Sequence, residues 1–184
     1  MSPRLPIKPL ALVLLAASLG ACSLHNPAPA KTAAALNNED WYQVRTDNEL
    51  FVFDDYQVFR DFIATGKAPY LKDLQRKDKH GQSIILALRA EDQGKQLEQI
   101  AAYQFLNVSL PPATPFYGEI RQHGVIYVFQ RYGDMMDTFS LGEPIFRHTE
   151  IASGPRGERV VYGLTKEESK PLALIDAFQA RYKR

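Results

Sequence analysis

Apolar and polar positions alternate along two similar stretches of the chain, and each stretch predicts a β-hairpin. The predicted strands are 41–45 and 49–53 in the first stretch, and 117–121 and 125–129 in the second. The first pair flanks Asp47-Asn48 and the second flanks His123-Gly124. Asn and Gly both accept the positive φ of a tight turn, so both hairpins have suitable turn residues.

Each hairpin is followed by apolar residues at helical spacing. In the first stretch they follow Asp54-Asp55, a candidate helix cap, and lie on one helical face: Val58, Phe59, Phe62 and Ile63. In the second stretch they are Met135, Met136 and Phe139. Gly66 and Gly142 come directly after these segments, and glycine commonly ends a helix in the left-handed conformation.

A second hairpin and a closing helix complete each stretch. The predicted strands are 70–74 and 83–88 in the first, and 147–152 and 159–164 in the second. The closing helix of the first stretch is predicted from its apolar face: Leu97, Ile100, Ala101 and Phe105. In the second stretch Ser169 is a candidate cap for a helix containing Ile175, Phe178 and Tyr182.

The two stretches align without a gap when the sequence is shifted by 76 residues. Between 51–91 and 127–167 there are eight identities in 41 positions, where average composition gives roughly two or three. We therefore predict an α+β fold of two tandem ββαββα-like repeats with a mainly antiparallel sheet. The alternative is a similar local pattern occurring twice in one unduplicated domain. Duplication predicts that two aligned pairs are buried, namely Phe53 with Phe129 and Ile85 with Val161.

The first residues have the character of a targeting segment. Arg4 and Lys8 precede an apolar run, 9–20, that is too short to span a bilayer. The run ends in Leu19-Gly20-Ala21-Cys22, which resembles the lipobox of bacterial lipoproteins. The resemblance implies cleavage before Cys22 and attachment of lipid to its thiol. The alternative is an ordinary secretory signal in which a cysteine happens to follow.

We therefore expect four segments: a signal peptide (1–21), a lipidated tether (22–38), repeat 1 (39–110) and repeat 2 (111–184). Ser23 follows the cysteine, and in the lipoprotein family this residue usually directs the protein to the outer membrane. The resemblance thus implies an outer-membrane protein facing the periplasm, rather than an inner-membrane one.

Charge and cysteine content exclude some classes of protein. The chain has 22 basic and 21 acidic side chains, and removal of Arg4 and Lys8 leaves 20 against 21. A balance this close to neutral has no broad electrostatic attraction for nucleic acid. Cys22 is the only cysteine, so the domain has no internal disulfide and depends on its packed core.

No local motif for catalysis, a cofactor or a metal is present in the sequence. The four histidines lack the spacing of metal ligands; they are His25, His80, His123 and His148. Asp54-Asp55 is a candidate pair of carboxylates for acid–base catalysis, but the shifted alignment replaces it by Gln130-Arg131. A helix cap explains the pair better.

The charged hairpin loops and the aromatic residues are the other candidates for binding. The loop 76–81 carries Arg76 and His80, and the corresponding hairpin loop of the second stretch carries Arg156 and Arg159. Such loops bind anionic glycans or phosphates in some proteins, but hairpin tips are commonly charged because they are solvated. Tyr56 and Tyr132 align before the two helices, where they are either sugar-stacking residues or core residues.

These observations predict a non-catalytic, lipid-anchored periplasmic module that binds a protein, a glycan or a peptidoglycan component. One alternative is a periplasmic enzyme with its site between the two repeats. Another is a structural or assembly accessory lipoprotein that associates through its sheet. The only site residue assigned from the sequence is Cys22, as the lipidation site, and no cofactor is expected.

Overall fold

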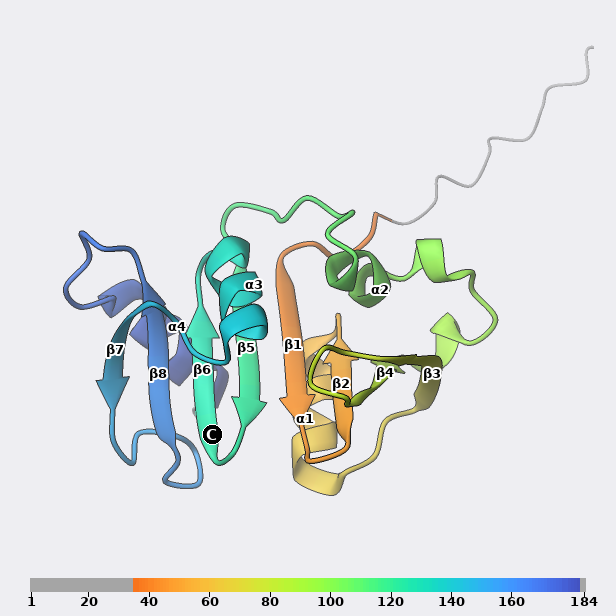
Figure 1. Cartoon of the computed structure of the whole chain (residues 1–184), viewed down its shortest axis with the longest axis horizontal. Coiled ribbons are helices and arrows are strands. Elements are labelled where there is room, and N and C mark those ends of the chain that lie inside the picture. The colour runs from red at the N-terminus through yellow and green to blue at the C-terminus, as the bar shows by residue number, and fades with distance from the viewer. Residues whose placement is uncertain (1–34, 183–184) are drawn as a thin grey trace, which may run out of the picture. The chain divides into compact units, whose positions relative to one another are not determined.

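Eight strands form one mixed sheet in the computed structural model, which describes residues 35–182 (Figure 1). The strands are β1 (Asp40–Arg45), β2 (Glu49–Phe53), β3 (Tyr70–Lys77), β4 (Ser83–Leu88), β5 (Tyr117–Gln122), β6 (Val125–Phe129), β7 (Phe146–Glu150) and β8 (Arg159–Leu164). The α-helices are α1 (Tyr56–Thr65), α2 (Ala101–Leu106), α3 (Tyr132–Leu141) and α4 (Leu172–Tyr182), and the short 3₁₀ turns are η1 (Ala90–Asp92) and η2 (Leu97–Gln99). None of the helices in this part of the chain is long and apolar enough to cross a membrane.

The sheet contains parallel as well as antiparallel ladders. Its order is β3-β4-β2-β1-β5-β6-β8-β7. Each hairpin is antiparallel, but β2 pairs with β4, β6 with β8 and β1 with β5 in parallel. The prediction of a mainly antiparallel sheet is therefore not confirmed. The chain passes through a helix and an edge strand between β2 and β4, and again between β6 and β8, and such a long connection allows the two strands that it joins to be parallel neighbours.

The elements follow one another in the same order in residues 40–106 and in residues 117–182, here called the first half and the second half. The starts of four pairs of elements differ by 76 residues: Glu49 and Val125 for β2 and β6, Tyr56 and Tyr132 for α1 and α3, Tyr70 and Phe146 for β3 and β7, Ser83 and Arg159 for β4 and β8. Residues related by this offset are called counterparts below.

The halves meet at the parallel ladder of β1 and β5 in the middle of the sheet. Two hydrophobic clusters cover its faces: one packs α2 and α3 on one face, and the other packs α1 and α4 on the opposite face (Figure 1). Phe53 belongs to the cluster with α1, and its counterpart Phe129 belongs to the cluster with α3. A half-turn about an axis parallel to the strands places counterparts on opposite faces in this way, because it keeps the direction of the strands and exchanges the two faces of the sheet.

Several sequence predictions about burial and caps are confirmed. Phe53 and Phe129 are both fully buried. The side chain of Asp55 caps α1 by accepting from the Val58 N–H at 2.9 Å. Gly66 and Gly142 follow α1 and α3 with φ of 72° and 94°, which is the left-handed region that glycine enters without strain.

Three predictions differ from the structure. Ile85 is only half-buried, because its neighbour on the edge strand is the exposed Asp73; Val161 is buried as predicted. The first closing helix is shorter than predicted, because Ile100 is extended (φ −113°, ψ 118°) and separates η2 from α2. Ser169 does not begin the last helix, which starts at Leu172 after a proline.

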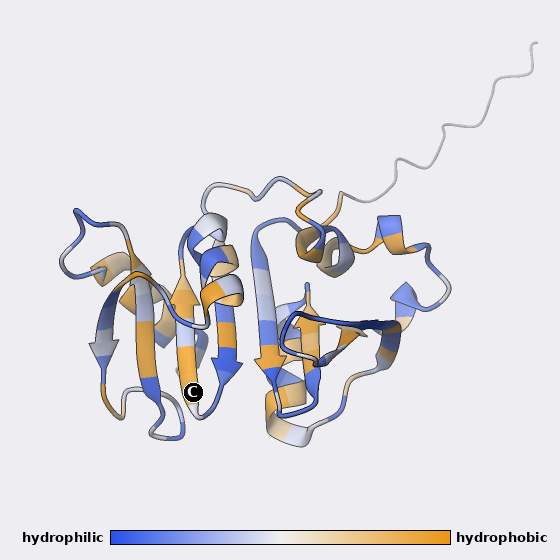
Figure 2. Ribbon diagram, in the orientation of Figure 1, coloured by the Kyte–Doolittle hydropathy of each residue, from blue (hydrophilic) through white to orange (hydrophobic). Residues whose placement is uncertain are grey.

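The distribution of hydropathy explains the position of the strands. Figure 2 shows β2, β6 and β8 as mostly hydrophobic and the edge strand β3 as hydrophilic. Strands in the interior of a sheet are covered on both faces, whereas a charged edge strand discourages pairing with another chain.

The chain enters the sheet beside the α2 end of the first half. Asn37 donates to the backbone oxygen of Asp54 at 2.7 Å, and Asn38 donates to that of Pro111 at 3.0 Å. These two residues lie at the end of the segment expected to be a tether, and both are bound to the domain. The end of that segment therefore belongs to the folded domain.

Candidate functional site

Two polar centres lie where the halves meet, on opposite faces of the sheet. Gln43 on β1 and its counterpart Glu119 on β5 are both fully buried. Arg45 and its counterpart Arg121 follow two residues later, near the ends of the same strands. Polar residues at interior strand positions need partners, so the bonds of these two centres decide which of them is available to a ligand.

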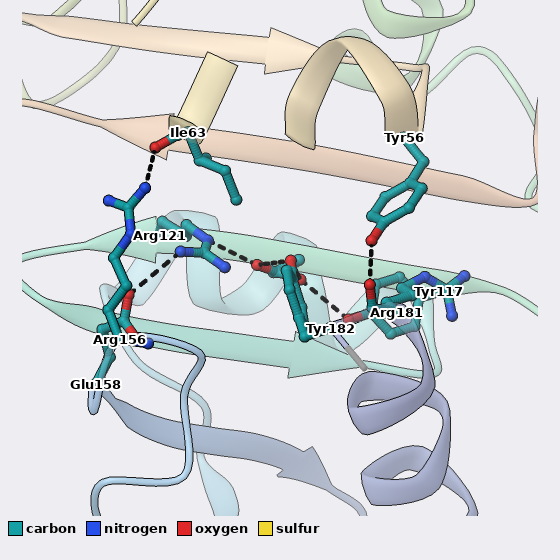
Figure 3. Close-up of polar contacts among 9 residues, drawn as sticks. Tyr56, Ile63, Tyr117, Arg121, Arg156, Glu158, Arg181 and Tyr182 are labelled. Carbon is teal, nitrogen blue, oxygen red and sulfur yellow. Dashed lines mark hydrogen bonds and ion pairs between the residues drawn. The ribbon is translucent and has the colours of Figure 1, made fainter. Parts of the chain in front are cut away.

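The first centre is the Glu119 network, formed by Tyr117, Glu119, Arg121 and Tyr182 (Figure 3). The carboxylate of Glu119 accepts from Arg121 Nε at 2.8 Å, from the Tyr182 hydroxyl at 2.8 Å and from the Tyr117 hydroxyl at 3.0 Å. Arg121 also lies 3.5 Å from Glu158. Tyr182 comes from α4, so the network ties the last helix to the central strands.

The members of the Glu119 network bond mainly to one another, although the buried Nη2 of Arg121 has no hydrogen-bond partner within residues 35–182. Burial raises the pKa of Tyr117 well above its usual value, and Glu119 raises it further. Burial also raises the pKa of Tyr182. Burial acts to lower the pKa of Arg121, but Glu119 and Tyr182 outweigh it, so that pKa is raised. The Arg121 guanidinium therefore stays charged beside Glu119, and the network stabilises the domain rather than presenting reactive groups.

A further arginine, Arg156 on the loop between β7 and β8, contacts helix α1. Arg156 Nη2 donates to the backbone oxygen of Ile63 at 2.6 Å, from the β7–β8 loop to the last turn of α1 (Figure 3). Helix carbonyls in a last turn lack an intrahelical donor, so the guanidinium satisfies one of them. Arg156 was a candidate binding residue from the sequence, and its bond here joins the two halves.

The second centre surrounds Arg45 on the other face. Arg45 Nη1 donates to Asp78 Oδ2 at 2.8 Å and to Gln82 Oε1. The two charged side chains are 5 % and 1 % exposed. Burial acts to raise the pKa of Asp78, but the bonds from Arg45 and from two backbone N–H groups outweigh it, so the pKa is lowered. Gln82 is the counterpart of Glu158, so both halves pair this arginine with the same position of the following strand.

Arg45 differs from Arg121 because it borders a larger hollow. The hollow, called the Arg45 cleft below, has a volume of about 330 Å³. It is lined by residues of both halves, among them Arg45, His80, Gln122, His123, Tyr127 and Phe139. The Arg45 guanidinium lies over the Phe139 ring at 4.8 Å. The Nη2 atoms of Arg45 and Arg121 are both buried and have no hydrogen-bond partner within residues 35–182. A smaller hollow of about 150 Å³ around His123 is lined by both arginines.

The structure distributes the other sequence-predicted residues as follows. Cys22 and His25 lie outside the described residues. Asp54 is buried and accepts from the Ala102 N–H at 2.8 Å, while Asp55 caps α1. The prediction that a cap explains this pair is confirmed for Asp55, and Asp54 holds the start of α2.

The structure brings two of the candidate histidines together and places a third elsewhere. His80 and His123, from different halves, border the same cleft, whereas His148 lies on β7 near Glu150 at 3.6 Å. No group of three or more potential metal ligands occurs in the described part of the chain. Arg76 of the basic loop donates to Asn107 at 3.1 Å.

The sequence prediction missed Gln43, Glu119, Arg45 and Arg121. The signal was present, because the 76-residue shift aligns the buried pair and the two arginines. A polar residue repeated inside two apolar strands predicts a buried hydrogen-bonded centre. What the sequence did not reveal is that β1 and β5 are neighbours.

Comparisons with known proteins give no match: no family model, no curated protein and no solved structure matches this chain.

Proposed function

We propose that this chain is a lipid-anchored binding module of the bacterial envelope, and that the Arg45 cleft is its ligand site. The single observation that carries the binding role is the cleft itself. It lies between the halves and is bordered by a 95 %-buried arginine with an unpartnered Nη2. Its volume of about 330 Å³ is at the small end of the range for small-molecule sites, about 300–1,000 Å³.

The surroundings of the two equivalent arginines support this assignment. Within residues 35–182 each arginine keeps a buried Nη2 without a hydrogen-bond partner. Arg121 is bonded within the Glu119 network, whereas Arg45 also borders the hollow of about 330 Å³. A buried donor without a partner is costly, so a ligand that supplies an acceptor gains binding energy there.

The anchor is supported by the sequence alone. Leu19-Gly20-Ala21-Cys22 resembles a lipobox, and Ser23 implies the outer membrane. Replacement of Cys22 by Ala should abolish palmitate labelling and leave an unprocessed precursor. Palmitate labelling of the Cys22→Ala chain contradicts lipidation, and fractionation of the native protein with the inner membrane contradicts the outer-membrane assignment.

We also propose that the domain arose by duplication of a ββαββα unit. The element order, the 76-residue offset of four pairs of elements and the exchange of Phe53 and Phe129 between faces support it. A duplicated unit provides two equivalent arginine sites, of which that of Arg45 borders the larger hollow.

The binding role is tested with the purified full chain and isolated envelope fractions: peptidoglycan sacculi, lipopolysaccharide and outer-membrane proteins. We expect one fraction to bind the wild type and to bind the double variant His80→Ala/His123→Gly at least tenfold more weakly. The control variant His148→Ala should bind as the wild type does. Absence of binding to every fraction overturns the proposal. Equal binding of the double variant overturns the assignment to the cleft.

An enzyme with its site in the same cleft is a second candidate, because two imidazoles border the cleft and imidazole is a common general acid or base. Incubation of the bound fraction followed by mass spectrometry distinguishes the two. A binding module returns the ligand unchanged, whereas an enzyme releases a product.

A further inference from the structure

We propose that the Arg45 cleft recognises an uncharged sugar residue, which rests on its assignment above as the ligand site. The charges around Arg45 point away from an anion. Its guanidinium is already paired with the buried Asp78 at 2.8 Å, and the carboxylate of Glu143 also borders the cleft. Glu143 in turn pairs with Arg147 at 3.2 Å. With no net positive charge, the cleft lacks the attraction that carboxylate or phosphate binding requires.

The groups that remain are a mixture of donors and acceptors. Arg45 Nη2 is an unpartnered donor. Gln122 donates its amide N–H to the Gly142 carbonyl at 2.7 Å, which leaves its amide oxygen as an acceptor. His80 and His123 each bring an imidazole to the cleft, and an imidazole ring in its neutral form has one donor and one acceptor nitrogen. A hydroxyl group both donates and accepts, so a polyhydroxylated ligand matches this set better than an ion does.

Apolar surface accompanies these polar groups. Tyr127 and Phe139 border the same cleft, and small-ligand sites typically combine aromatic walls with a few convergent polar groups. The C–H face of a sugar ring is apolar and its rim is polar. A pyranose ring can therefore contact the aromatic side chains while its hydroxyls bond to the arginine, amide and imidazole groups.

The opposite face indicates how the ligand is held. There Arg156 donates to the Ile63 carbonyl in the last turn of α1. The counterparts are His80 and Phe139, and no side-chain hydrogen bond of His80 occurs within the described residues. The cleft is thus open where the other half places a guanidinium, and a ligand hydroxyl there supplies a donor for the last turn of α3.

The four histidines allow the proposal to be tested on the full chain. Protein labelled with ¹³C at histidine Cε1 is titrated with N-acetylglucosamine, with glucuronic acid and with inorganic phosphate, up to 50 mM each. We expect N-acetylglucosamine to shift the signals of His80 and His123 with saturation, and to leave those of His148 unchanged. The two anions should cause no saturable shift.

Two variants check that the shifts report contact. His80→Ala and His123→Gly should each weaken N-acetylglucosamine binding about threefold to tenfold, the effect of one hydrogen bond. Glycine suits position 123 because His123 has a positive φ of 51°. His148→Ala, at a histidine outside the cleft, should bind as the wild type does.

Three outcomes overturn the inference. A saturable shift with phosphate or glucuronate alone makes the cleft an anion site, and shifts centred on His148 place the ligand elsewhere. If an envelope fraction binds through the cleft but N-acetylglucosamine, chitobiose and glucose all leave the His80 and His123 signals unchanged, the ligand is not an uncharged sugar. In that last case the binding module stands and only its proposed ligand class is wrong.

Discussion

Tyr56 and Tyr132 make the same hydrogen bond on opposite faces of the sheet. The Tyr56 hydroxyl donates to the backbone oxygen of Arg181 at 2.5 Å, and the Tyr132 hydroxyl donates to that of Phe105 at 2.6 Å. The two donors are counterparts, and so are the two acceptors. Each tyrosine therefore binds the closing helix of the other half, and the halves are joined reciprocally at a distance from the central ladder.

This relationship predicts matched losses of stability. Tyr56→Phe and Tyr132→Phe should each lower the free energy of unfolding by about 1 kcal/mol, because each removes one hydrogen bond and leaves a carbonyl unpaired. The effects should be additive, since the two sites share no partner. Tyr70→Phe is the control, because no hydrogen bond of the Tyr70 hydroxyl is found in residues 35–182. Urea denaturation followed by circular dichroism measures the free energy of unfolding of the wild type, of each single variant and of the double variant. A loss of stability in only one of the two tyrosine variants contradicts reciprocal joining.

The glycines after α1 and α3 should resist substitution for backbone reasons alone. A Cβ at Gly66 or Gly142 meets no atom within 4 Å, so the cost of a side chain is its left-handed geometry. Gly66→Val and Gly142→Val should each destabilise by about 1–2 kcal/mol. Gly133 is equally open but has no positive φ, so Gly133→Ala should not destabilise. Similar losses at all three positions in thermal unfolding contradict the conformational explanation.

Removal of the Glu119 carboxylate charge should be among the most damaging single changes. Glu119→Gln leaves the buried Arg121 guanidinium with only Glu158, at 3.5 Å, and should cost about 3–5 kcal/mol. The exposed pair Glu143–Arg147 is the control, and Glu143→Gln should cost less than about 0.5 kcal/mol. The double variant Glu119→Leu/Arg121→Leu should recover part of the loss. No recovery in a double-mutant cycle indicates that the two groups are not coupled.

The buried tyrosines should limit stability at alkaline pH. Burial raises the pKa of Tyr117 and of Tyr182 above the usual 10.0. A raised pKa in the folded state gives a contribution that is complete below the unfolded pKa and is lost as pH rises through the folded one. Unfolding should therefore begin above about pH 10. Absorbance at 295 nm, which reports tyrosine ionisation, should show the buried tyrosines ionising together with the loss of near-ultraviolet circular dichroism. Full ionisation of all nine tyrosines while the chain stays folded contradicts the prediction.

Asp54 should destabilise the domain at neutral pH. Burial raises the pKa of Asp54, and the Ala102 N–H only partly offsets this. A raised pKa means that the folded state favours the protonated form of Asp54. The contribution of this group to stability is therefore lost as the pH rises through the raised pKa. Asp54→Asn keeps an acceptor for Ala102 and removes the charge, so it should raise Tm at pH 8 by about 2–4 °C and give no advantage at pH 3. A lower Tm at pH 8 contradicts the prediction and assigns Asp54 an essential charge.

Local structure was largely readable from the sequence. The strands at 49–53, 83–88, 125–129 and 159–164 have the predicted bounds, because alternation and turn residues are local signals. The Ile100 break was not readable: the apolar face of 97–105 has helical spacing, and only the tertiary contacts of Ile100 set its extended backbone.

The arrangement of the halves was beyond the sequence because it depends on long-range pairing. Nothing in Val44 or Arg121 alone shows that they are neighbours in a parallel ladder. The Arg45 cleft exists only because that ladder brings His80 and His123 to the same place. The two histidines were named from the sequence and the repeated arginine is visible in the shifted alignment, but their association required the sheet order.

The direction of β1 separates the cleft from the amino-terminal side of the domain. Asn37 lies three residues before this strand, and the Arg45 cleft lies at the strand's other end. The six extended residues of β1 span about 20 Å. A molecule bound in the cleft therefore does not compete for space with one that contacts the domain at Asn37, and both can be held at once.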